Sequence, residues 1–391
     1  MLSLFSKQLL ASISPPTLLL DLDAFDENCR QIASKANGKK IRIASKSIRS
    51  VPVLKRILDS NPVFQGVMSF SPHEAIFLAE KGFDDILIGY PCWDHDALLK
   101  IAQVTESRIV LMVDSLEHID YLEKLAEEAE GRFLLCMDID MSTTFASLHF
   151  GVRRSPIKNE EDALQLAERI KKATRLELIG VMGYEAQIAG VGDQVPTQRL
   201  KSKLVSFLKN KSLTEIQSRR QSIIRALNEK GFSLSLVNGG GTGSLHTTTI
   251  EEEVTEVTVG SGFYAPLLFD YYKDFRYEPS LFFALPIVRK PAPQIYTCLG
   301  GGYIASGAIG ADKEPKPVFP KGGKLLSLEG AGEVQTPVYF ENEKLEIGDP
   351  ILFRAAKAGE ICERFNEIIC VSNNQIVDHY QTYRGEGVCF L

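Results

Sequence analysis

The sequence lacks several features that mark whole classes of protein. Its seven cysteines are scattered, odd in number and never arranged as a CxxC pair. This distribution argues against a disulfide framework and a zinc ribbon, and it predicts a chain that works in a reducing cytoplasm. No stretch approaches the ~18 apolar residues of a membrane-spanning helix, so no membrane partner is expected. With 44 basic and 50 acidic residues the net charge is −6, which argues against the basic face needed for nucleic-acid binding.

The N-terminal segment also lacks the marks of a targeting signal. Residues 1–16 read MLSLFSKQLLASISPP, with one lysine, no long apolar core and no small-residue cleavage pattern. We therefore expect a short helix that ends at Pro15 and Pro16 rather than a signal peptide. The chain as a whole has 391 residues, of which 44% are hydrophobic and 24% charged. That is the composition of a globular protein with room for two domains.

Apolar, β-branched runs alternate with amphipathic helical segments from residue 17 to about residue 262. Most of these runs recur roughly every 20 to 25 residues, the rhythm of strands alternating with helices, and such strands predict a parallel sheet. The predicted strands are Thr17–Asp23, Ile41–Lys46, Phe64–Phe70, Asp85–Tyr90, Arg108–Asp114, Phe133–Asp140, Leu176–Tyr184, Ser233–Gly240 and Glu256–Gly260. With the first strand as a lead-in, the other eight suffice for an α/β fold of the (β/α)8 TIM-barrel type. A doubly wound sheet is the alternative.

The composition and periodicity of the chain change after about residue 275. Prolines are dense between Pro279 and Pro320, and no helical period persists. Short β-rich segments follow at Gln294–Leu299, Lys324–Ser327, Pro337–Phe340, Pro350–Phe353, Glu367–Ser372 and Gln375–Tyr380. We predict a barrel over residues 13–274 and a mostly antiparallel β domain over residues 275–391, with residues 1–12 as a candidate addition to the second domain.

A glycine-rich loop, VNGGGTGS at residues 237–244, is the strongest local signal. Consecutive glycines let backbone N–H groups approach an anion closely, and the hydroxyls of Thr242 and Ser244 add donors. No lysine follows the last glycine, so the loop is not a Walker A motif, and it lies too late in the chain for a dinucleotide fingerprint. The residues Gly260 and Ser261 would supply the other half of a phosphate cup. The alternative is a tight turn without a ligand.

Lys46 ends the first barrel strand, in the sequence IRIASK. In a barrel the chemistry lies at the C-terminal ends of the strands. A barrel mouth can shield a lysine from water, which favours the neutral amine that forms a Schiff base. Taken alone, a solvated loop lysine is the simpler interpretation. Together with the phosphate cup, we expect Lys46 to be shielded from water and to face the glycines at 239–241.

Several motifs resemble one family of enzymes. Residues 42–49, RIASKSIR, resemble the lysine strand of the D-threonine aldolase and D-serine dehydratase family, whose pattern is roughly RPHxKTHK. The likeness covers nearly the whole chain. Residues 15–30 resemble the family's opening, residues 138–140 its sixth strand and residues 183–185 its YEGH-like turn. This family shares its barrel with alanine racemases and uses pyridoxal phosphate (PLP).

The resemblance implies a set of cofactor contacts. Lys46 would carry the PLP as a Schiff base, and Tyr184 would line the cofactor ring. Arg42, Asn238 and His149 would be further cofactor-binding residues. The phosphate would be held by Gly240, Gly241, Thr242, Gly260 and Ser261. The resemblance also implies a homodimer that acts on a small amino-acid substrate.

The departures from the family pattern concern three positions. Where the family carries an arginine in an RxGV motif, this chain reads HFGV, so His149 is either its replacement or an incidental loop histidine. Where aldolases and dehydratases carry HxC or HxD metal ligands, residues 360–366 read EICERFN. Glu360 and Cys362 are therefore candidate ligands of a divalent metal, although the pair is atypical for zinc. Alternatively the metal is absent and Lys357 and Glu360 contact the substrate directly.

Tyr303, in GGYIASG, resembles the tyrosine base of alanine racemases, with a tyrosine in a glycine hairpin as the alternative. By resemblance the chain is a PLP-dependent lyase that cleaves, or dehydrates and deaminates, a D-3-hydroxy amino acid. An amino-acid racemase with Tyr303 as second base is the main rival. A non-catalytic PLP carrier and a Rossmann-type oxidoreductase are alternatives of other classes, and the additional β domain favours an enzyme over a carrier.

Overall fold

The computed structural model describes residues 5–195, 198–308 and 310–391. Residues 1–4 of the predicted N-terminal helix lie outside these ranges, and its remainder forms α1 (Lys7–Ser12), capped by the side chain of Ser6. The chain divides into two compact units. One comprises residues 1–32, 47–56 and 261–389, and the other residues 33–46, 57–260 and 390–391. The helices α2 (Leu22–Ser34) and α3 (Val51–Ser60) contribute residues to both.

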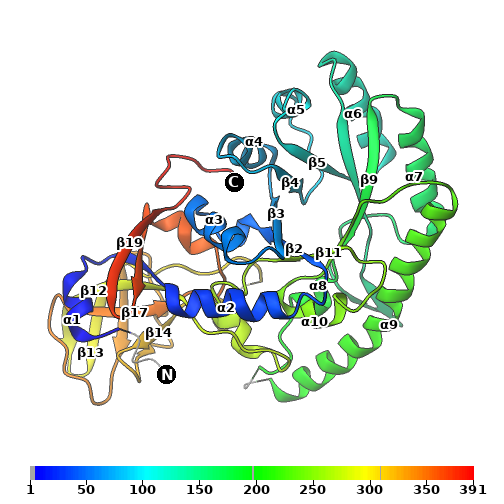
Figure 1. The fold of residues 1–391 in the computed structure, drawn as a ribbon. Coiled ribbons are helices and arrows are strands. Elements are labelled where there is room, and N and C mark those ends of the chain that lie inside the picture. Colours follow the sequence, from blue (N-terminus) through cyan, green and yellow to red (C-terminus); the bar gives the residue numbers. More distant parts are fainter. Residues whose placement is uncertain (1–4, 196–197, 309) are drawn as a thin grey trace. The chain divides into compact units, whose positions relative to one another are not determined.

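Within the described ranges, the second unit contains a closed barrel of eight parallel strands (Figure 1). The strands are β2 (Lys40–Ala44), β3 (Phe64–Ser69), β4 (Asp85–Ile88), β5 (Arg108–Val113), β6 (Phe133–Asp138), β9 (Leu176–Gly183), β10 (Leu236–Gly239) and β11 (Glu256–Val259). Their order around the barrel is β10-β11-β2-β3-β4-β5-β6-β9. The predicted (β/α)8 fold is confirmed, because a doubly wound sheet would stay open.

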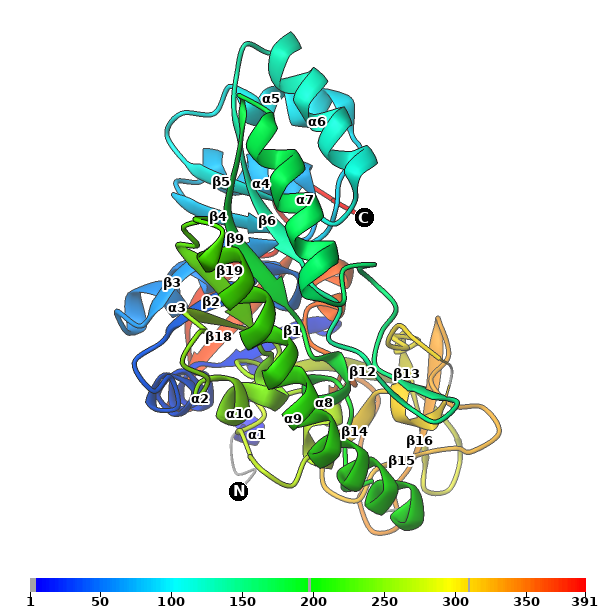
Figure 2. The same cartoon turned by 90° about the vertical axis from the view of Figure 1, so that its right-hand side faces the viewer.

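Helices alternate with these strands, and several begin where the sequence places a capping side chain. The helices are α4 (Pro72–Glu80), α5 (His95–Ala102), α6 (Leu116–Glu128), α7 (Glu160–Lys172), α8 (Ala186–Ala189), α9 (Arg199–Glu229) and α10 (Leu245–Thr248). The N-cap side chains of Ser71, Ser115 and Asn159 each accept a hydrogen bond from a backbone N–H of the first turn. The helix α9 packs against α7 (Figure 2).

A short hairpin interrupts the alternation between β6 and β9. It consists of β7 (Thr143–Phe145) and β8 (Leu148–Phe150), which pair antiparallel. The sequence did not predict these strands, because three-residue strands carry too little alternation to be recognised. The hairpin matters for the site because it carries His149 and leads directly to Arg153 and Arg154.

The other unit is built on a nine-stranded sheet, as far as the described residues show. Its strands are β1 (Thr17–Asp21), β12 (Leu281–Ala292), β13 (Ile295–Leu299), β14 (Lys316–Phe319), β15 (Lys324–Leu325), β16 (Gln335–Tyr339), β17 (Pro350–Arg354), β18 (Glu367–Ser372) and β19 (Gln375–Gln381). Most pairs are antiparallel, and β15, β16, β13 and β12 follow one another in this order, with β14 pairing with β17. The short helices η1 (Ser45–Ser47), η2 (Thr242–Ser244), η3 (Leu267–Tyr271), η4 (Ala311–Lys313) and η5 (Glu360–Arg364) complete the chain.

The predicted lead-in strand belongs to this sheet. β1 pairs antiparallel with β12 and parallel with β18, which explains why the N-terminal residues group with the β unit. The sequence missed β12 because Pro286 and Pro291 interrupt it, and proline removes a backbone donor from a strand.

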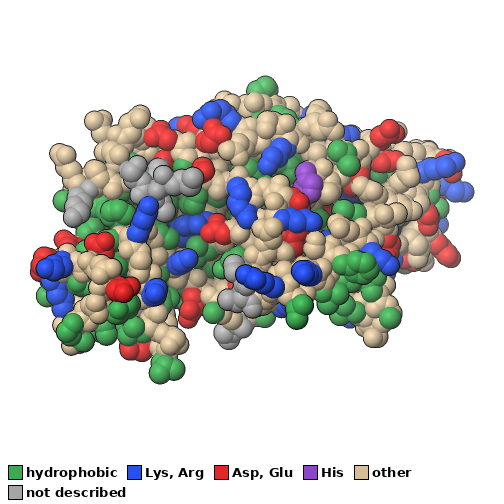
Figure 3. Space-filling model, turned by 90° about the horizontal axis from the view of Figure 1, so that it is seen from below, with side chains coloured by type: hydrophobic (Ala, Val, Ile, Leu, Met, Phe, Trp, Pro, Cys, Tyr) green, Lys and Arg blue, Asp and Glu red, His purple; other side chains and the backbone are tan. Residues whose placement is uncertain are grey.

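The surface carries both signs of charge. Figure 3 shows lysine and arginine side chains intermixed with aspartate and glutamate on one face of the molecule. Among the residues that the structure describes, no helix has the length and apolar composition needed to span a bilayer.

Candidate active site

Lys46 belongs to η1, directly after β2, so it lies at the C-terminal rim of the barrel. Its Nζ atom is 2.6 Å from the phenolic oxygen of Tyr90, which follows β4. The same nitrogen lies 5.3 Å from the centroid of the Tyr90 ring. In the sequence, 43 residues lie between Lys46 and Tyr90. The barrel order β2-β3-β4 nevertheless brings the two strand ends close together.

Lys46 is exposed, which corrects the expectation that the chain shields it from water. The η1 turn carries the side chain beyond the last residue of β2, so the amine projects past the apolar barrel wall. Its immediate environment is therefore set by neighbouring polar and aromatic groups rather than by burial.

Arg154 is the charged neighbour of this pair. Its guanidinium carbon lies 5.4 Å from the Tyr90 ring centroid and 5.0 Å from the ring centroid of Tyr184, which follows β9. Burial alone would raise the pKa of Tyr90, but the positive charges of Lys46 and Arg154 and their hydrogen bonds outweigh it and lower that pKa. Burial raises the pKa of Tyr184 to about 12, with Arg154 opposing. The pKa values of the two tyrosines at the rim are thus shifted in opposite directions.

The glycine loop after β10 is held closely by its neighbours. The N–H of Gly240 donates to Glu185 at 3.2 Å, and the N–H of Gly241 donates to the hydroxyl of Ser244 at 3.0 Å. Gly240 has a φ of +74°, a conformation that favours glycine, and a Cβ at Gly241 would lie 2.8 Å from that of Ala189. Two N–H groups predicted to hold a phosphate therefore already have acceptors within the chain.

A buried ion-pair network supports this loop from behind. Arg220, in the middle of α9, donates to Glu185 at 2.9 Å and to the carbonyl of Gly183 at 3.0 Å, and it also pairs with Glu251. Glu185 in turn accepts from the hydroxyl of Ser244 at 2.9 Å. Because Arg220 is almost wholly buried, this network fixes the position of the loop relative to the end of β9.

Arg42 and Asn238, two predicted cofactor contacts, take part in a buried polar network. The Nε atom of Arg42 donates to Glu256 at 2.6 Å, and its Nη2 atom donates to Glu256 and to Asp85, each at 2.9 Å. Asn238 donates to the same Glu256 at 2.7 Å. Both side chains are buried, so their hydrogen bonds to carboxylates stabilise the barrel. Their contact with the cofactor stays a prediction.

Acidic side chains gather where β5 and β6 end. Asp138 is buried, and burial raises its pKa to about 7. That value already includes the effect of Arg154, which lowers the pKa, and of the carboxylates of Asp114 and Asp140, which raise it. Asp138 is therefore a carboxyl group whose charge state changes near neutral pH.

His149 does not take the place that the sequence suggested for it. Its ring lies on β8, half-buried, and its Nε2 atom has no hydrogen-bond partner among the described residues. Arg154, five positions later, is the residue whose positive charge reaches the tyrosines at the rim.

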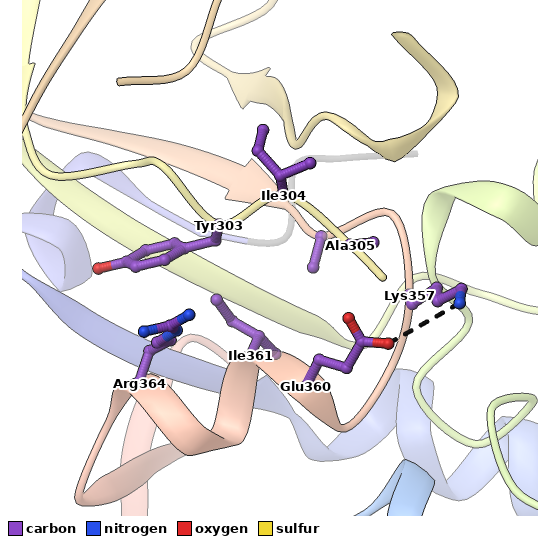
Figure 4. A pocket seen from close by; sticks show the side chains of 8 residues that line it. Tyr303, Ile304, Ala305, Lys357, Glu360, Ile361 and Arg364 are labelled. Atoms are coloured by element: carbon purple, nitrogen blue, oxygen red, sulfur yellow. Dashed lines mark ion pairs between the residues drawn. The ribbon is translucent and has the colours of Figure 1, made fainter. Parts of the chain in front are cut away.

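A small pocket of about 70 Å³ lies in the β unit (Figure 4). Its lining residues are Tyr303, Ile304, Ala305, Ala355, Lys357, Glu360, Ile361 and Arg364. Tyr303 packs edge-on against Phe283 and Phe365, with ring centroids 5.1 and 5.7 Å away. Burial raises the pKa of Tyr303, and Arg364 partly offsets this effect. The tyrosine thus lines a pocket beside a positive charge rather than only a glycine hairpin.

The side chains of Glu360 and Cys362 contact different residues and do not share a partner in the contacts described below. The Glu360 carboxylate accepts from the N–H and the hydroxyl of Ser306 at 2.8 and 2.6 Å, and it lies 3.8 Å from the ammonium of Lys357. The Cys362 thiol is buried beside Tyr264, and burial raises its pKa to about 12. Metal binding needs a thiolate and converging ligands, and across the described ranges no three His, Cys, Asp or Glu side chains are grouped to hold a metal. The predicted pair does not fit a divalent metal.

Comparison with known proteins identifies the family. The family model described as "Alanine racemase, N-terminal domain" matches residues 20–266. The chain belongs to this family. A 3-hydroxy-D-aspartate aldolase of Paracoccus denitrificans (strain Pd 1222) is 24% identical over 255 residues, which cover 64% of this chain and 60% of that protein. For a second Paracoccus denitrificans protein of the same description, the match covers 46% of each chain. The chain thus matches between about half and three fifths of the length of these relatives.

Solved structures share the fold over almost the whole chain. D-threonine aldolase from Filomicrobium marinum gives a TM-score of 0.81 at 18% identity, covering 96% of both chains. D-threo-3-hydroxyaspartate dehydratase from Delftia sp. HT23 gives a TM-score of 0.74 at 16% identity, covering 95% of this chain and 98% of that one. At these identities the likeness establishes the fold, the β unit included.

The residues at the barrel rim fit pyridoxal phosphate. The order β10-β11-β2 places the glycine loop two strands from Lys46 on one rim, so an amine and a set of backbone and hydroxyl donors share that rim. Sequence reasoning missed Tyr90 and Arg154, although both follow strand ends, the same signal that identified Lys46. It also missed Arg220, for which a mid-helix position gives no signal.

Proposed function

We propose that this chain is a PLP-dependent lyase that acts on D-3-hydroxy amino acids, by retro-aldol cleavage or by dehydration with deamination. The observation that carries the proposal is the Lys46 amine at the rim of this family's barrel, hydrogen-bonded to Tyr90 and two strands from the glycine loop. The names of the relatives support the substrate class, because 3-hydroxy-D-aspartate and D-threonine both carry a hydroxyl on the β-carbon.

Each part of the cofactor would have a partner at the rim. Lys46 would hold PLP covalently, and the ring of Tyr184 would lie against it. Thr242, with the neighbouring loop backbone, would hold the phosphate, and Gly240 and Gly241 would do so only by giving up their present acceptors. Gly260 and Ser261 remain the predicted second half of the cup. When bound, PLP withdraws electrons from the substrate carbon that bears the amino group.

With PLP bound, Lys46 would also supply the proton chemistry: freed when the substrate amine takes its place, it would act as a base toward the substrate. If it took the proton of the β-hydroxyl, the Cα–Cβ bond would break and an aldehyde would leave. If it took the Cα proton, the hydroxyl would leave, and a 2-oxo acid and ammonia would follow. Arg154 would supply a positive charge at the rim, where the family pattern carries the arginine that His149 was one candidate to replace.

An absorbance and product assay tests the proposal. Adding PLP to the full chain should give an absorption band near the visible edge, and Lys46→Ala should abolish it. Lys40→Ala, which removes an exposed amine at the other end of β2, should leave the band intact. D-threonine should then yield an aldehyde, or D-serine and 3-hydroxy-D-aspartate should yield a 2-oxo acid and ammonia.

Each other outcome contradicts a part of the proposal. A band that survives Lys46→Ala would remove Lys46 from the mechanism. A band without product from any of these substrates would indicate a PLP carrier. Conversion of D-alanine into its enantiomer would indicate a racemase, with Tyr303 as the second base to be tested. A homodimer in a reducing cytoplasm remains part of the proposal, supported by the resemblance and by the scattered cysteines.

A further inference from the structure

Lys46 needs a partner that accepts its proton. An ammonium has no lone pair, so it cannot attack an aldehyde or act as a base until one N–H proton has left. The sequence predicted that burial would favour the neutral amine, but Lys46 is exposed. Tyr90 is the neighbouring group placed to take the proton, with 2.6 Å between its oxygen and the lysine nitrogen.

We propose that Tyr90 is the proton-transfer partner of Lys46. Its phenolate oxygen takes a proton from the lysine ammonium, which becomes a neutral amine able to react, while Tyr90 becomes a neutral phenol. One N–H bond breaks, one O–H bond forms, and the nitrogen keeps its electron pair. The inference rests on the proposed function only in taking Lys46 as the reacting amine.

The surroundings of Tyr90 suit this role. Charged and titratable groups face it from three strand ends: Lys46 after β2, Arg154 after β8 and Tyr184 after β9. Asp138 acts on it indirectly, because Asp138 and Arg154 interact. Two cations beside one phenol stabilise its phenolate, which lowers the pKa of Tyr90 against the effect of burial.

Tyr184 provides the contrast that gives the inference its specificity. It lies at the same rim and beside the same arginine, but burial raises its pKa, whereas the pKa of Tyr90 is lowered. When the environments of two titratable groups in a site push their pKa values apart, the groups serve different roles. Tyr184 remains a neutral ring surface, and Tyr90 exchanges the proton.

The rate of covalent PLP attachment to Lys46 tests this inference. With the full-length chain freed of cofactor, attachment is followed by absorbance after mixing with PLP across a range of pH. Tyr90→Phe should slow attachment about a hundredfold near neutral pH, the lower end of the range for general acid–base catalysis, and the rate should recover at high pH. Tyr121→Phe is the matched control, because Tyr121 lies on α6 and its hydroxyl donates to the backbone carbonyl of Trp93.

A further measurement separates proton transfer from packing. Substituting Tyr90→3-fluorotyrosine keeps the shape of the side chain but makes the phenol more acidic, so the pH profile of attachment should move to lower pH. This readout remains informative if Tyr90→Phe folds poorly, because the fluorinated variant differs from the wild-type chain by one atom.

The results distinguish this inference from the proposed function. If the wild-type chain never attaches PLP at Lys46, the proposed function fails. If it does attach PLP, but Tyr90→Phe matches it in rate and pH profile, only the role of Tyr90 is overturned. A rate that falls equally at every pH, with the fluorotyrosine profile unmoved, would assign Tyr90 to packing and would also overturn the inference.

Discussion

The barrel holds charged side chains at two levels, and the two levels behave differently. In the interior, Arg42 and Glu256 are buried, and together with Asp85 they form direct ion pairs at 2.6 to 2.9 Å. At the rim, Lys46 and Arg154 are exposed, and they contact aromatic rings and one phenolic oxygen. Both levels carry positive charge toward the barrel axis, so residue type alone does not separate them.

The difference shows what burial does to a charge. In a low-dielectric interior an unpaired ion is strongly disfavoured, so Arg42 cannot leave its carboxylates during a reaction. At the rim, water can solvate a group that changes partner, so Lys46 is able to exchange a hydrogen bond for a covalent bond. Interior charges therefore hold the strands together, and rim charges are available for chemistry.

The largest effect on stability is expected from removing the interior ion pairs. Arg42→Met leaves Glu256 and Asp85 without their cation, which should lower the free energy of unfolding by about 3–5 kcal/mol. Urea denaturation followed by circular dichroism measures this change. Arg108→Met is the matched control, because Arg108 is more exposed and lies 3.9 Å from the same Asp85. It should cost less than about 1 kcal/mol, and equal losses in the two variants would contradict the distinction.

An intermediate effect is expected from Asp138, which lies between the two levels at the end of β6. Its pKa is about 7 in the folded chain, against about 4 in an unfolded one, so the folded state binds the extra proton between these values. Stability from this group is therefore greatest below pH 4 and is lost as the pH rises through 7. Asp138→Asn should flatten this dependence and raise the free energy of unfolding at pH 8 by about 2–4 kcal/mol.

Unfolding free energies measured from pH 4 to pH 8 check this prediction. The control is Asp120→Asn, which removes a carboxylate from an exposed ion pair with Arg169 on the outside of the barrel. Its dependence on pH should follow that of the wild-type chain. A steep loss of stability between pH 4 and pH 7 that persists in Asp138→Asn would show that the titrating group lies elsewhere.

The sequence predicted the architecture well because the necessary signals are local. Apolar runs, capping residues such as Ser115 and Asn159, and the position of a residue at a strand end can all be read without knowing the fold. The sequence could not show whether a side chain lies in the barrel interior or at the rim. Arg42 and Lys46 are only four positions apart, and only the structure shows that Arg42 lies buried within β2 and Lys46 lies exposed in the turn that follows it.

The contacts that define the rim depend on closure of the barrel. Tyr90 reaches Lys46 because β4 lies two strands from β2, and Arg154 reaches both tyrosines because the β7–β8 hairpin returns the chain to the rim. Neither contact leaves a periodic or spacing signal. The hydrogen bonds between Glu360 and Ser306 also leave no signal in the sequence. A motif comparison therefore suggested a metal ligand at Glu360, whereas the structure shows a carboxylate that accepts hydrogen bonds from Ser306.

The smallest effect on stability is expected from removing charge at the rim. Arg154→Met loses two contacts to aromatic faces in an exposed setting, worth about 0.5–1 kcal/mol, so the free energy of unfolding should fall by less than about 1 kcal/mol. The same change should move the pH profile of PLP attachment to higher pH, because Arg154 helps to lower the pKa of Tyr90. Arg154→Lys, which keeps the charge, should move the profile less. Thermal unfolding together with the attachment rate measures both quantities in one preparation. A large loss of stability with an unchanged profile would place Arg154 with Arg42 among the structural charges, and the two levels of the barrel would then not differ in the way their burial implies.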